Sequence, residues 1–564
     1  MKRIPRRVLA GATVPALAVV GAMVATTPSQ AAPNGPTMQI QLLSFNDFHG
    51  NLEPPAGSNG RLVSGHTLSG GIPSDVTTTV GGAEYLATHL ATAREGHPYS
   101  LTVAAGDLIG ASPFLSAAFH DEPTIEALNA MKLDVSAVGN HEFDEGYAEL
   151  QRMANGGCID DGDGVNNQNS CPTGSFSGAA FDYLAANVKY AGTNRTILPA
   201  YAIKNIKGAK IGFIGMTLKD TPAIVTAAGV AGLEFTDEVA TANALVPVLR
   251  AQGVKAIVVL IHQGGSPGQQ TWYGPDNKPY TVNPTYNAAC ADGAVLKSTS
   301  PILDIAARLD PQIDMVISGH THQPYVCSVL DPAGQQRLVT SASSFGRLFT
   351  DTELTYDRRT QDIVRASVAS ANMLVTRDVA KDTFQTNLIE KYHELVRPIA
   401  SNVVGHVTQD VSKTGNLAGE SQLGDLIADA QLADPSVVKD GKVPQIAFMN
   451  PGGIRADLAY SFSPYGEAAG DITFEEAFTV QPFNNYLVSM DLTGAQIRTI
   501  LGQQWSGANA AAPRILQVNK ELTYSYSGTT LGAVKVGGQQ LVDTQTYRVV
   551  TNNFLQGGGD NFAG

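Results

Sequence analysis

Residues 135–144 read VSAVGNHEFD, an apolar run followed directly by four polar side chains. The run VSAV is typical of a short strand that is buried on both faces. Asn140, His141, Glu142 and Asp144 then come where that strand ends, and buried polar groups cost free energy unless a partner satisfies them. Their partner is either ordinary hydrogen bonding or a metal ion together with a substrate.

The same pattern recurs through the first half of the chain. Apolar runs followed at once by polar residues occur at 40–50, 100–107, 210–217, 256–265 and 314–322. Helix-like segments lie between several of them, at 82–94, 124–131, 238–252 and 301–310. This alternation predicts a layered α/β sheet, in which ligands lie at the carboxyl ends of the strands. We therefore expect polar residues that are far apart in the sequence to meet in one site.

The second half predicts a smaller domain. Residues 380–400 read as a helix with Pro398 near its end, and we expect this helix to join two domains. An α/β or α+β region is then indicated by a helix at 421–434, a strand and loop at 446–455, a strand and helix within 485–505, and a last strand at 547–554. A chain of 564 residues is long enough for at least two domains.

Composition excludes some classes of protein. A hydrophobic fraction of 43% and a charged fraction of 16% indicate a globular rather than a disordered chain. The net charge of -14 gives no general attraction to a polyanion, so a phosphate-bearing substrate would need local metal ions or a few placed arginines. We predict no stable nucleic-acid or membrane partner, and the oligomeric state stays open.

The N-terminus reads as an export signal. MKRIPRR is basic, residues 8–25 are apolar, and Ser29 and Ala31 have the spacing that a signal peptidase reads. We expect residues 1–31 to be cleaved and the protein to be secreted or held in the cell envelope. Arg6 and Arg7 leave the export pathway open, and an uncleaved membrane anchor is the alternative.

Four cysteines fit an oxidising compartment. Of the three possible pairings we favour nearest neighbours, Cys158 with Cys171 and Cys290 with Cys327. The loop over 158–171 also clusters oxygen ligands of the kind that Ca²⁺ takes: Asp160, Asp161, Asp163 and Asn166. It lacks a full EF-hand pattern, so a solvated loop is favoured and a calcium site is the alternative.

The polar residues at the strand ends are candidate metal ligands. They are Asp47, His49, Asp107, Asn140, His262, His320 and His322. Each motif alone is common in turns or helix caps, but five together at strand ends disfavour that reading. Oxygen and imidazole ligands without thiolate suit Zn, Mn or Fe. Asp107 is our candidate for a carboxylate that bridges two ions, and alternate strand positions place His320 and His322 on the same side.

These motifs carry a family resemblance. Asp47-x-His49, Gly106-Asp107, Gly139-Asn140-His141-Glu142, His262 and Gly319-His320-x-His322 resemble, in order, the motif series of calcineurin-like metallophosphoesterases. GGAEYLATHL resembles the helix after the first metal loop there. In the second half, NPGGIRADL, VQPFNNYLVSMDLTG and TNNFLQGGGD resemble the 5′-nucleotidase C-terminal domain. From about residue 39 onward, the chain resembles the secreted bacterial 5′-nucleotidase, UDP-sugar hydrolase and 2′,3′-cyclic phosphodiesterase family.

The resemblance implies an α/β fold of two domains. A layered metallophosphoesterase β-sandwich flanked by helices is expected over 38–375 and a linker helix over 376–402. A smaller α/β substrate-binding domain is expected over 403–564. Because the family usually continues beyond the GGGD motif, it stays open whether this domain is complete at residue 564.

The resemblance also implies two divalent metal ions, Zn, Mn or similar. One would be held by Asp47, His49, Asp107 and His322, and the other by Asp107, Asn140, His262 and His320. His141 would face the phosphate without binding metal, and Asp144 would orient its ring. The implied substrate contacts are Asn450, Arg455, Phe483, Asn485, Phe554 and Asp560, with the two phenylalanine rings on either side of the base.

The implied function is an exported dinuclear-metal phosphohydrolase that releases phosphate from 5′-nucleotides and related esters by metal-activated water. A broader 2′,3′-cyclic phosphodiesterase, UDP-sugar hydrolase or extracellular nuclease with the same metal centre is the alternative. It is favoured because NLAGESQLG at 416–424 lacks arginines that the family often carries. His322 stands where the family often has Gln or Asn, which leaves the metal open. A non-catalytic binding protein is disfavoured because no inferred ligand is missing.

Overall fold

The computed structural model describes residues 35–160, 162, 168–290, 295–510 and 512–563. The expected signal peptide at 1–31 lies outside the described residues, as do Asp161, Asp163 and Asn166 of the expected calcium loop. In the described ranges, no helix combines the length and the apolar character that crossing a bilayer requires.

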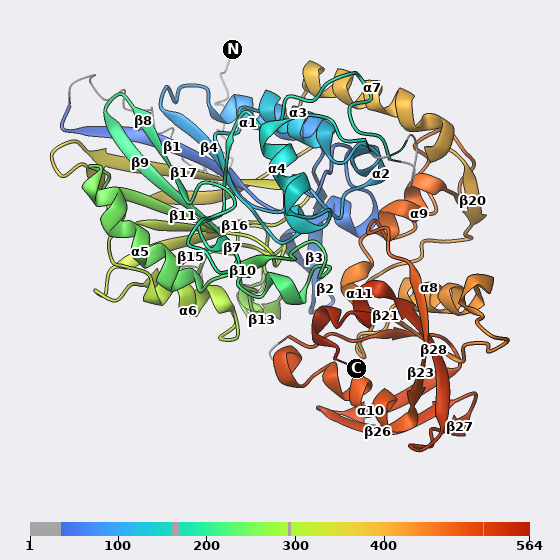
Figure 1. Cartoon of the computed structure of the whole chain (residues 1–564). Helices are drawn as coiled ribbons and strands as arrows, with labels where there is room; N and C mark the ends of the chain where they lie inside the picture. Colours follow the sequence, from blue (N-terminus) through green and yellow to red (C-terminus); the bar gives the residue numbers. More distant parts are fainter. Residues whose placement is uncertain (1–34, 161, 163–167, 291–294, 511, 564) are drawn as a thin grey trace, which may run out of the picture. The chain divides into compact units, whose positions relative to one another are not determined.

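The first half of the described chain forms two large sheets in layers (Figure 1). The first sheet has the order β18-β17-β1-β4-β5-β6, with β19 also paired to β17, and the second has the order β15-β16-β14-β11-β9-β8. The strands of the first sheet are β1 (Thr37–Phe45), β4 (Ser100–Ala105), β5 (Val135–Ala137), β6 (Asp182–Leu184), β17 (Leu348–Asp357), β18 (Asp362–Ile363) and β19 (Ala369–Leu374). Those of the second are β8 (Tyr201–Ile206), β9 (Ala209–Thr217), β11 (Ala256–His262), β14 (Met315–Ser318), β15 (Pro324–Leu330) and β16 (Gln336–Ala342).

A hydrophobic core fills the space between these sheets. Ile40 and Val103 of the first sheet join Phe213 and Val258 of the second in one buried cluster. Residues of the same strands that point the other way, such as Phe45, belong to a separate cluster. Because successive strand residues alternate between faces and both faces are covered, the strands are apolar throughout. This is why the sequence shows uninterrupted apolar runs.

Helices cover the outer faces of both sheets. The cluster outside the first sheet takes residues from α1 (Ala83–Ala93), α3 (Glu122–Ala130) and α7 (Thr383–Ala400). The cluster outside the second takes residues from α5 (Glu238–Ala251) and α6 (Pro301–Arg308). The described part of this half also has α4 (Tyr147–Asn155) and the single turn α2 (Phe114–Ala117). The predicted layered α/β fold is confirmed.

The second half has its own sheet and core. Its four-stranded sheet runs β23-β28-β21-β24, and a separate cluster of buried residues packs against it. These strands are β21 (Ile446–Met449), β23 (Leu487–Thr493), β24 (Gln517–Val518) and β28 (Thr546–Asn552). The helices are α8 (Gln422–Ala433), α9 (Phe474–Val480), α10 (Gly494–Gln503) and α11 (Asn553–Gln556).

The predicted last strand at 547–554 is too long. β28 ends at Asn552, whose side-chain oxygen accepts a hydrogen bond from the backbone N–H of Leu555 at 2.8 Å. This capping bond starts α11, because it satisfies an N–H that has no partner inside the helix. Phe554 therefore lies in a short helix and not in the strand.

Hairpins and short sheets were not visible in the sequence patterns. β2 (Arg61–Ser69) pairs with β3 (Ile72–Thr79), and β12 (Gln270–Tyr273) pairs with β13 (Pro279–Val282). Two further pairs are β7 (Val188–Tyr190) with β10 (Leu233–Phe235) and β20 (Val403–His406) with β22 (Asp471–Thr473). A three-stranded sheet is formed by β25 (Leu522–Ser527), β26 (Thr530–Val536) and β27 (Gln539–Gln540).

The favoured cysteine pairing is correct, since Cys158 is bonded to Cys171 and Cys290 to Cys327.

The loops after β4 and β5 touch through their backbones. Gly106 has φ of +81°, and a Cβ there would lie 2.5 Å from the nitrogen of Gly139 and 2.7 Å from the carbonyl carbon of Val138. A side chain at residue 106 would therefore push apart the two loops that carry Asp107 and Asn140.

We expect Gly106→Ala to destabilise the protein by about 3 kcal/mol or more, because strain and a backbone clash add together. Gly96→Ala is the matched control, since Gly96 has the same φ of +81° but no atom within 4 Å of its added Cβ. The control should lose only the cost of a left-handed residue, about 1–2 kcal/mol. Denaturant unfolding measures both, and equal losses would contradict the contact between the loops.

Candidate functional site

The candidate site lies where polar residues leave the carboxyl ends of parallel strands. Its members come from the loops after β1, β4, β5 and β14 and from the last residue of β11. Five of them have left-handed backbone: Asp47 (φ 52°), His49 (48°), Asp107 (50°), His320 (71°) and His322 (56°). Residues other than glycine seldom adopt this conformation, and such strain is concentrated at functional sites.

The expectation that His320 and His322 share one face of a strand is wrong. β14 ends at Ser318, so both histidines belong to the loop that follows it. Their positive φ values turn the backbone sharply. As a result the two imidazoles join different groups of potential ligands.

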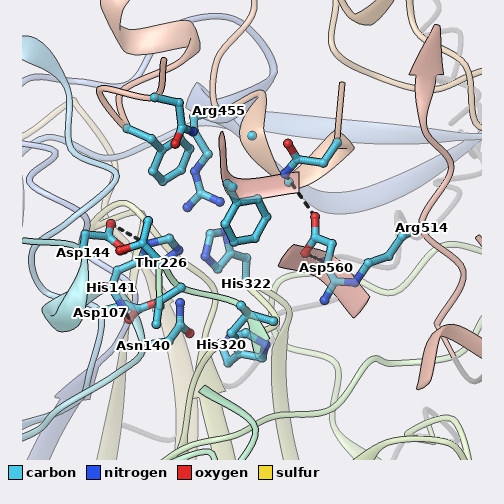
Figure 2. Close-up of a pocket in the computed structure, with 18 of the residues that line it drawn as sticks. Asp107, Asn140, His141, Asp144, Thr226, His320, His322, Arg455, Arg514 and Asp560 are labelled. Atoms are coloured by element: carbon cyan, nitrogen blue, oxygen red, sulfur yellow. Dashed lines mark hydrogen bonds and ion pairs between the residues drawn. The ribbon is translucent and has the colours of Figure 1, made fainter. Parts of the chain in front are cut away.

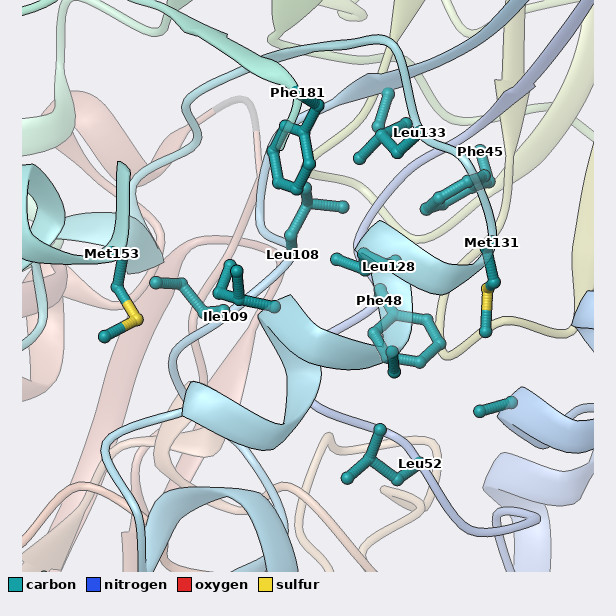
Figure 3. Close-up of a cluster of buried hydrophobic side chains, with 14 of the residues drawn as sticks. Phe45, Phe48, Leu52, Leu108, Ile109, Leu128, Met131, Leu133, Met153 and Phe181 are labelled. Carbon is teal, nitrogen blue, oxygen red and sulfur yellow. The ribbon is translucent and has the colours of Figure 1, made fainter. Parts of the chain in front are cut away.

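Apolar side chains hold the site loops in place. Phe48, between Asp47 and His49, is fully buried, and Leu108 and Ile109 directly follow Asp107. These three side chains belong to the cluster outside the first sheet (Figure 3). Each loop thus buries apolar residues on one side and presents polar ones on the other.

One group of potential ligands consists of Asp47, His49 and His322. Nε2 of His322 is 3.1 Å from Nε2 of His49 and 3.2 Å from Oδ1 of Asp47. Nδ1 of His49 is 2.9 Å from the carbonyl oxygen of Gly110, which favours the tautomer with a lone pair on Nε2. Burial lowers the pKa of His49 and of His322 well below the usual range, so both rings are neutral.

A second group consists of Asp107, His262 and His320. Nε2 of His262 is 2.9 Å from Oδ2 of Asp107, and its Nδ1 is 2.7 Å from the carbonyl oxygen of Ala105. Burial lowers the pKa of His320 to about 3. Oδ1 of Asn140 is buried without a hydrogen-bond partner among the described residues.

This donor set fits divalent cations, and Asp107 belongs to more than one group of potential ligands. Nε2 of His49 lies 3.6 Å from Oδ2 of Asp107, the oxygen that also faces His262. Neighbouring ligands around an ion at about 2.1 Å lie about 3–3.4 Å apart, which is close to the separations seen in both groups. Asp47 and Asp107 are 0% and 1% exposed, and buried carboxylates require compensating positive charge. The unpartnered oxygen of Asn140 is also of the kind that binds such ions.

His141 and Asp144 form a pair beside these groups, and His141 also makes a third group of potential ligands with His49 and Asp107. Nδ1 of His141 is 2.8 Å from Oδ2 of Asp144, and the backbone N–H of His141 donates to Oδ1 of Asp107 at 2.8 Å. Burial opposes the charged imidazole, but the negative charges of Asp144 and Asp107 outweigh it and raise the pKa of His141. The ring can therefore carry a proton next to the potential metal ligands.

Glu142 has a positioning role that the sequence patterns did not indicate. Its carboxylate accepts hydrogen bonds from the backbone N–H groups of Asp107 at 3.0 Å, Leu108 at 2.8 Å and Gly139. Burial raises the pKa of this carboxyl to about 7. Glu142 thus ties the loop after β4 to the loop after β5 and fixes the backbone of Asp107.

A cavity of about 320 Å³ joins these residues to the second half of the chain (Figure 2). All six expected substrate contacts line it: Asn450, Arg455, Phe483, Asn485, Phe554 and Asp560. So do Asp107, Asn140, His141, Asp144, His320 and His322. Asp47, His49 and His262 are fully buried and do not line the cavity.

Phe483 and Phe554 are half-buried rings, not core residues. Neither belongs to a hydrophobic cluster among the described residues. The ring of Phe483 stacks on His141 with a centroid separation of 5.9 Å and an angle of 28°. Both rings therefore present apolar surface to the cavity.

Cationic groups lie on the side of the cavity nearest His49. Nη2 of Arg455 is 3.3 Å from Nε2 of His49, and its guanidinium lies 5.9 Å from the centre of Phe483. Lys413 donates to the carbonyl oxygen of Arg455 at 3.0 Å, and burial together with the Arg455 charge lowers the pKa of Lys413 to about 8. Sequence patterns missed Lys413, although it stands just before the arginine-free stretch at 416–424.

Arg514 and a loop from the first half were also missed. Nη1 of Arg514 donates to Oδ1 of Asp560 at 2.7 Å. Ile224, Val225 and Thr226, which follow β9, line the same cavity. No sequence motif singled them out, because an isolated arginine and a short apolar loop are ordinary on protein surfaces.

Comparisons with known proteins match this arrangement. Residues 40–324 match the calcineurin-like phosphoesterase family model, and residues 403–564 match the 5′-nucleotidase C-terminal domain. The chain is 30% identical to endonuclease YhcR of Bacillus subtilis over 94% of its own length and 37% of that protein. It is 33% identical to cell wall protein Lmo0130 of Listeria monocytogenes over 95% of its own length and 65% of that protein. It thus spans less than two thirds of either relative.

Among solved structures, the chain is similar to a 5′-nucleotidase precursor from Thermus thermophilus. The sequence identity is 26% and the TM-score is 0.67, with 93% of this chain and 91% of that chain covered. The similarity therefore extends across both halves of the described chain.

We expect Glu142→Gln to lower the free energy of unfolding by about 2–3 kcal/mol, because one amide oxygen cannot accept three converging N–H groups. Glu353→Gln is the control, since Glu353 pairs with His97 at the surface at 3.0 Å. Thermal unfolding with and without EDTA measures both variants. A Glu142→Gln protein that melts with the wild type would mean that its carboxylate does not hold the loops.

Proposed function

The chain belongs to the calcineurin-like phosphoesterase family, and on this premise we propose an exported dinuclear-metal phosphohydrolase that releases phosphate from 5′-nucleotides. One observation carries the proposal: a single cavity is lined by four of the potential metal ligands (Asp107, Asn140, His320 and His322), by the His141–Asp144 pair and by the two half-buried rings. The match of residues 403–564 to the 5′-nucleotidase C-terminal domain supports nucleotides as the substrate class.

Two sets of residues would hold the ions. Asp47, His49, Asp107 and His322 would hold one, and Asp107, Asn140, His262 and His320 the other. When bound, divalent ions supply positive charge to phosphoryl oxygens and lower the pKa of a water nucleophile. The ligands support Zn, Mn or a similar ion, because they are imidazoles and oxygens without thiolate.

His141 is the proposed proton donor or charge stabiliser. Asp144 holds Nδ1, which leaves Nε2 of His141 as the group available to the substrate. The raised pKa of His141 favours the protonated ring, which can donate to a phosphoryl oxygen or to the leaving alkoxide. Arg455 adds a positive charge next to His49, and Lys413 holds the backbone of Arg455 by donating to its carbonyl oxygen.

The second half of the chain would select the nucleoside. Phe483 and Phe554 would enclose the base, since aromatic stacking accepts any base. Asp560 and Asn450, joined by a hydrogen bond of 3.0 Å, would accept the ribose hydroxyls, with Asn485 as a further polar contact. Specificity for nucleotides would then come from contacts remote from phosphorus.

A broader phosphodiesterase or nuclease with the same metal centre is the second candidate. The similarity to a protein named endonuclease over 94% of this chain favours it. The arginine-free stretch at 416–424 also favours it, because Arg455 is the arginine that lines the cavity beside His49. Export of either enzyme is supported by the two disulfides, which are typical of oxidising compartments.

A substrate panel separates these functions. Protein loaded with Mn²⁺ or Zn²⁺ would be assayed on 5′-mononucleotides, 2′,3′-cyclic nucleotides, UDP-sugars and single-stranded DNA. We expect 5′-AMP to be hydrolysed and EDTA to stop the reaction. If DNA or cyclic nucleotides are cleaved and 5′-AMP is not, the protein is the broader phosphodiesterase or nuclease and not a 5′-nucleotidase.

We predict that His141→Ala lowers kcat by about 10²–10⁴-fold while metal content stays normal, since a proton donor is lost but no ligand. Asp107→Asn is the contrasting variant, because it should lose both activity and part of both metal equivalents. Phosphate-release assays and elemental analysis of the same samples test this. Loss of metal in His141→Ala would make His141 a ligand instead.

We predict that the Phe483→Ala/Phe554→Ala double variant loses about tenfold or more in kcat/KM for AMP, in line with the free energy of two stacking contacts. Hydrolysis of p-nitrophenyl phosphate should change little, because that substrate has no base to enclose. Tyr486→Ala is the control, since Tyr486 is 67% exposed and outside the cavity. Equal losses on both substrates would indicate that the rings only support the fold.

A further inference from the structure

The cavity has a second cationic group that the proposed function leaves unused. Arg455 lies beside His49, whereas Arg514 lies beside Asp560, the residue that we place at the ribose. Figure 2 shows the two arginine side chains reaching the cavity from different directions. A 5′-mononucleotide brings its phosphate to the first group and has no anionic part for the second.

Arg514 is held in place but has spare hydrogen-bonding capacity. Its backbone N–H donates to the carbonyl oxygen of Gln504 at 2.8 Å, which fixes the chain just before β24. The side chain is 31% exposed, and its single hydrogen bond within the described residues is the one from Nη1 to Asp560. A guanidinium has five N–H donors in a planar fork. Most of that fork is therefore free to bind an oxyanion.

The carboxylate of Asp560 has a second partner besides Arg514. Asn450 donates to its Oδ2 at 3.0 Å, and the side chain of Asn509 donates to its backbone carbonyl at 3.0 Å. Ribose hydroxyls would add donors to the same carboxylate. Arg514 neutralises this buried carboxylate with one N–H, and its remaining N–H groups can meet an anion on the substrate close to the ribose oxygens.

Resting on the nucleotide function above, we propose that the cavity accepts nucleotides that carry a second phosphate on the ribose, at O2′ or O3′, and that Arg514 binds this phosphate. Arginine binds phosphate through two parallel N–H donors, and Arg514 can offer such a pair while one N–H stays on Asp560. Asp560 alone would repel a ribose phosphate, so Arg514 decides whether such substrates enter.

The chemistry at the 5′ end is unchanged. Water adds to the 5′ phosphorus, the bond from phosphorus to O5′ breaks, and O5′ takes a proton. The products are phosphate and a nucleoside that keeps its 2′- or 3′-phosphate. The second phosphate can come from a free nucleoside bisphosphate or from the 3′ phosphodiester of a short oligonucleotide. Both present the same oxygens to Arg514.

Product binding tests the inference without turnover. Calorimetry would compare adenosine, adenosine 2′-phosphate and adenosine 3′-phosphate on the wild type, Arg514→Gln, Arg514→Lys and Arg498→Gln. Arg498 is the matched control, because its side chain is also 31% exposed and is 2.7 Å from a carboxylate, that of Asp543, outside the cavity. We expect one of the two phosphates to tighten wild-type binding about tenfold or more over adenosine. Arg514→Gln should remove this gain, Arg514→Lys should keep part of it, and Arg498→Gln should keep all of it.

Turnover then identifies the source of the second phosphate. The ratio of kcat/KM for adenosine 3′,5′-bisphosphate to that for AMP should fall about tenfold in Arg514→Gln. The dinucleotide pApA shows whether a chain phosphodiester is accepted as well as a free bisphosphate, and chromatography shows which phosphate is released.

The possible failures are distinguishable. If AMP is not hydrolysed and adenosine does not bind, the proposed function fails. If adenosine binds and AMP is hydrolysed, but neither phosphate improves binding, only the second-phosphate site fails. Equal losses on AMP and on the bisphosphate in Arg514→Gln would reduce Arg514 to a residue that positions Asp560. Release of the 3′-phosphate in place of the 5′-phosphate would overturn the proposed orientation.

Discussion

Two buried carboxylates set the main constraint on this structure. Asp47 and Asp107 are almost completely removed from solvent, and Oδ1 of Asp47 and Oδ2 of Asp107 both lie within 3.9 Å of Nε2 of His262. Two negative charges in such a place are unfavourable unless cations compensate them. Burial lowers the pKa values of His49, His320 and His322, whereas Asp107 and Asp47 raise the pKa of His262 to about 10. His262 thus offers one positive charge for two carboxylates. The surrounding structure is therefore best understood as a scaffold that keeps these groups together for the ions that we propose.

Two kinds of contact hold the site loops in place: apolar packing against the core and hydrogen bonds between the loops. Apolar residues such as Phe48 and Leu108 anchor the loops in the core, while Glu142 collects the N–H groups of the loops after β4 and β5. Left-handed backbone at five site residues adds strain, which only well-packed surroundings maintain. The ligand geometry is consequently fixed by the fold, before any ion or substrate arrives.

The cavity is lined by positively charged arginines although the chain as a whole is negatively charged. The net charge of -14 would repel a nucleotide, yet Arg455 and Arg514 stand at separate places within one cavity. The half-buried rings of Phe483 and Phe554 share this cavity with both. Under the proposed function, the first half of the chain would supply the reacting centre, and the second half would decide which phosphate esters reach it.

The layered α/β fold, the helices α1, α3, α5, α6, α7, α8 and α10, and most of the polar residues around the cavity could be predicted from the sequence and the family resemblance. The helices α2, α4, α9 and α11 and the cavity loop at 224–226 were not predicted. Buried strands leave apolar runs, and the site residues directly follow those runs, as in VSAVGNHEFD. The prediction that His320 and His322 lie on the same side of a strand was wrong. Their two-residue spacing is typical of a strand, but both residues have left-handed backbone in the loop after β14. Lys413, Arg514 and the role of Glu142 were decided only by tertiary structure. Lys413 donates to the carbonyl oxygen of Arg455, and Arg514 donates to Asp560. Glu142 accepts from the backbone N–H of Asp107. Such partnerships leave no spacing in the sequence, because they arise only when separate loops are folded against one another.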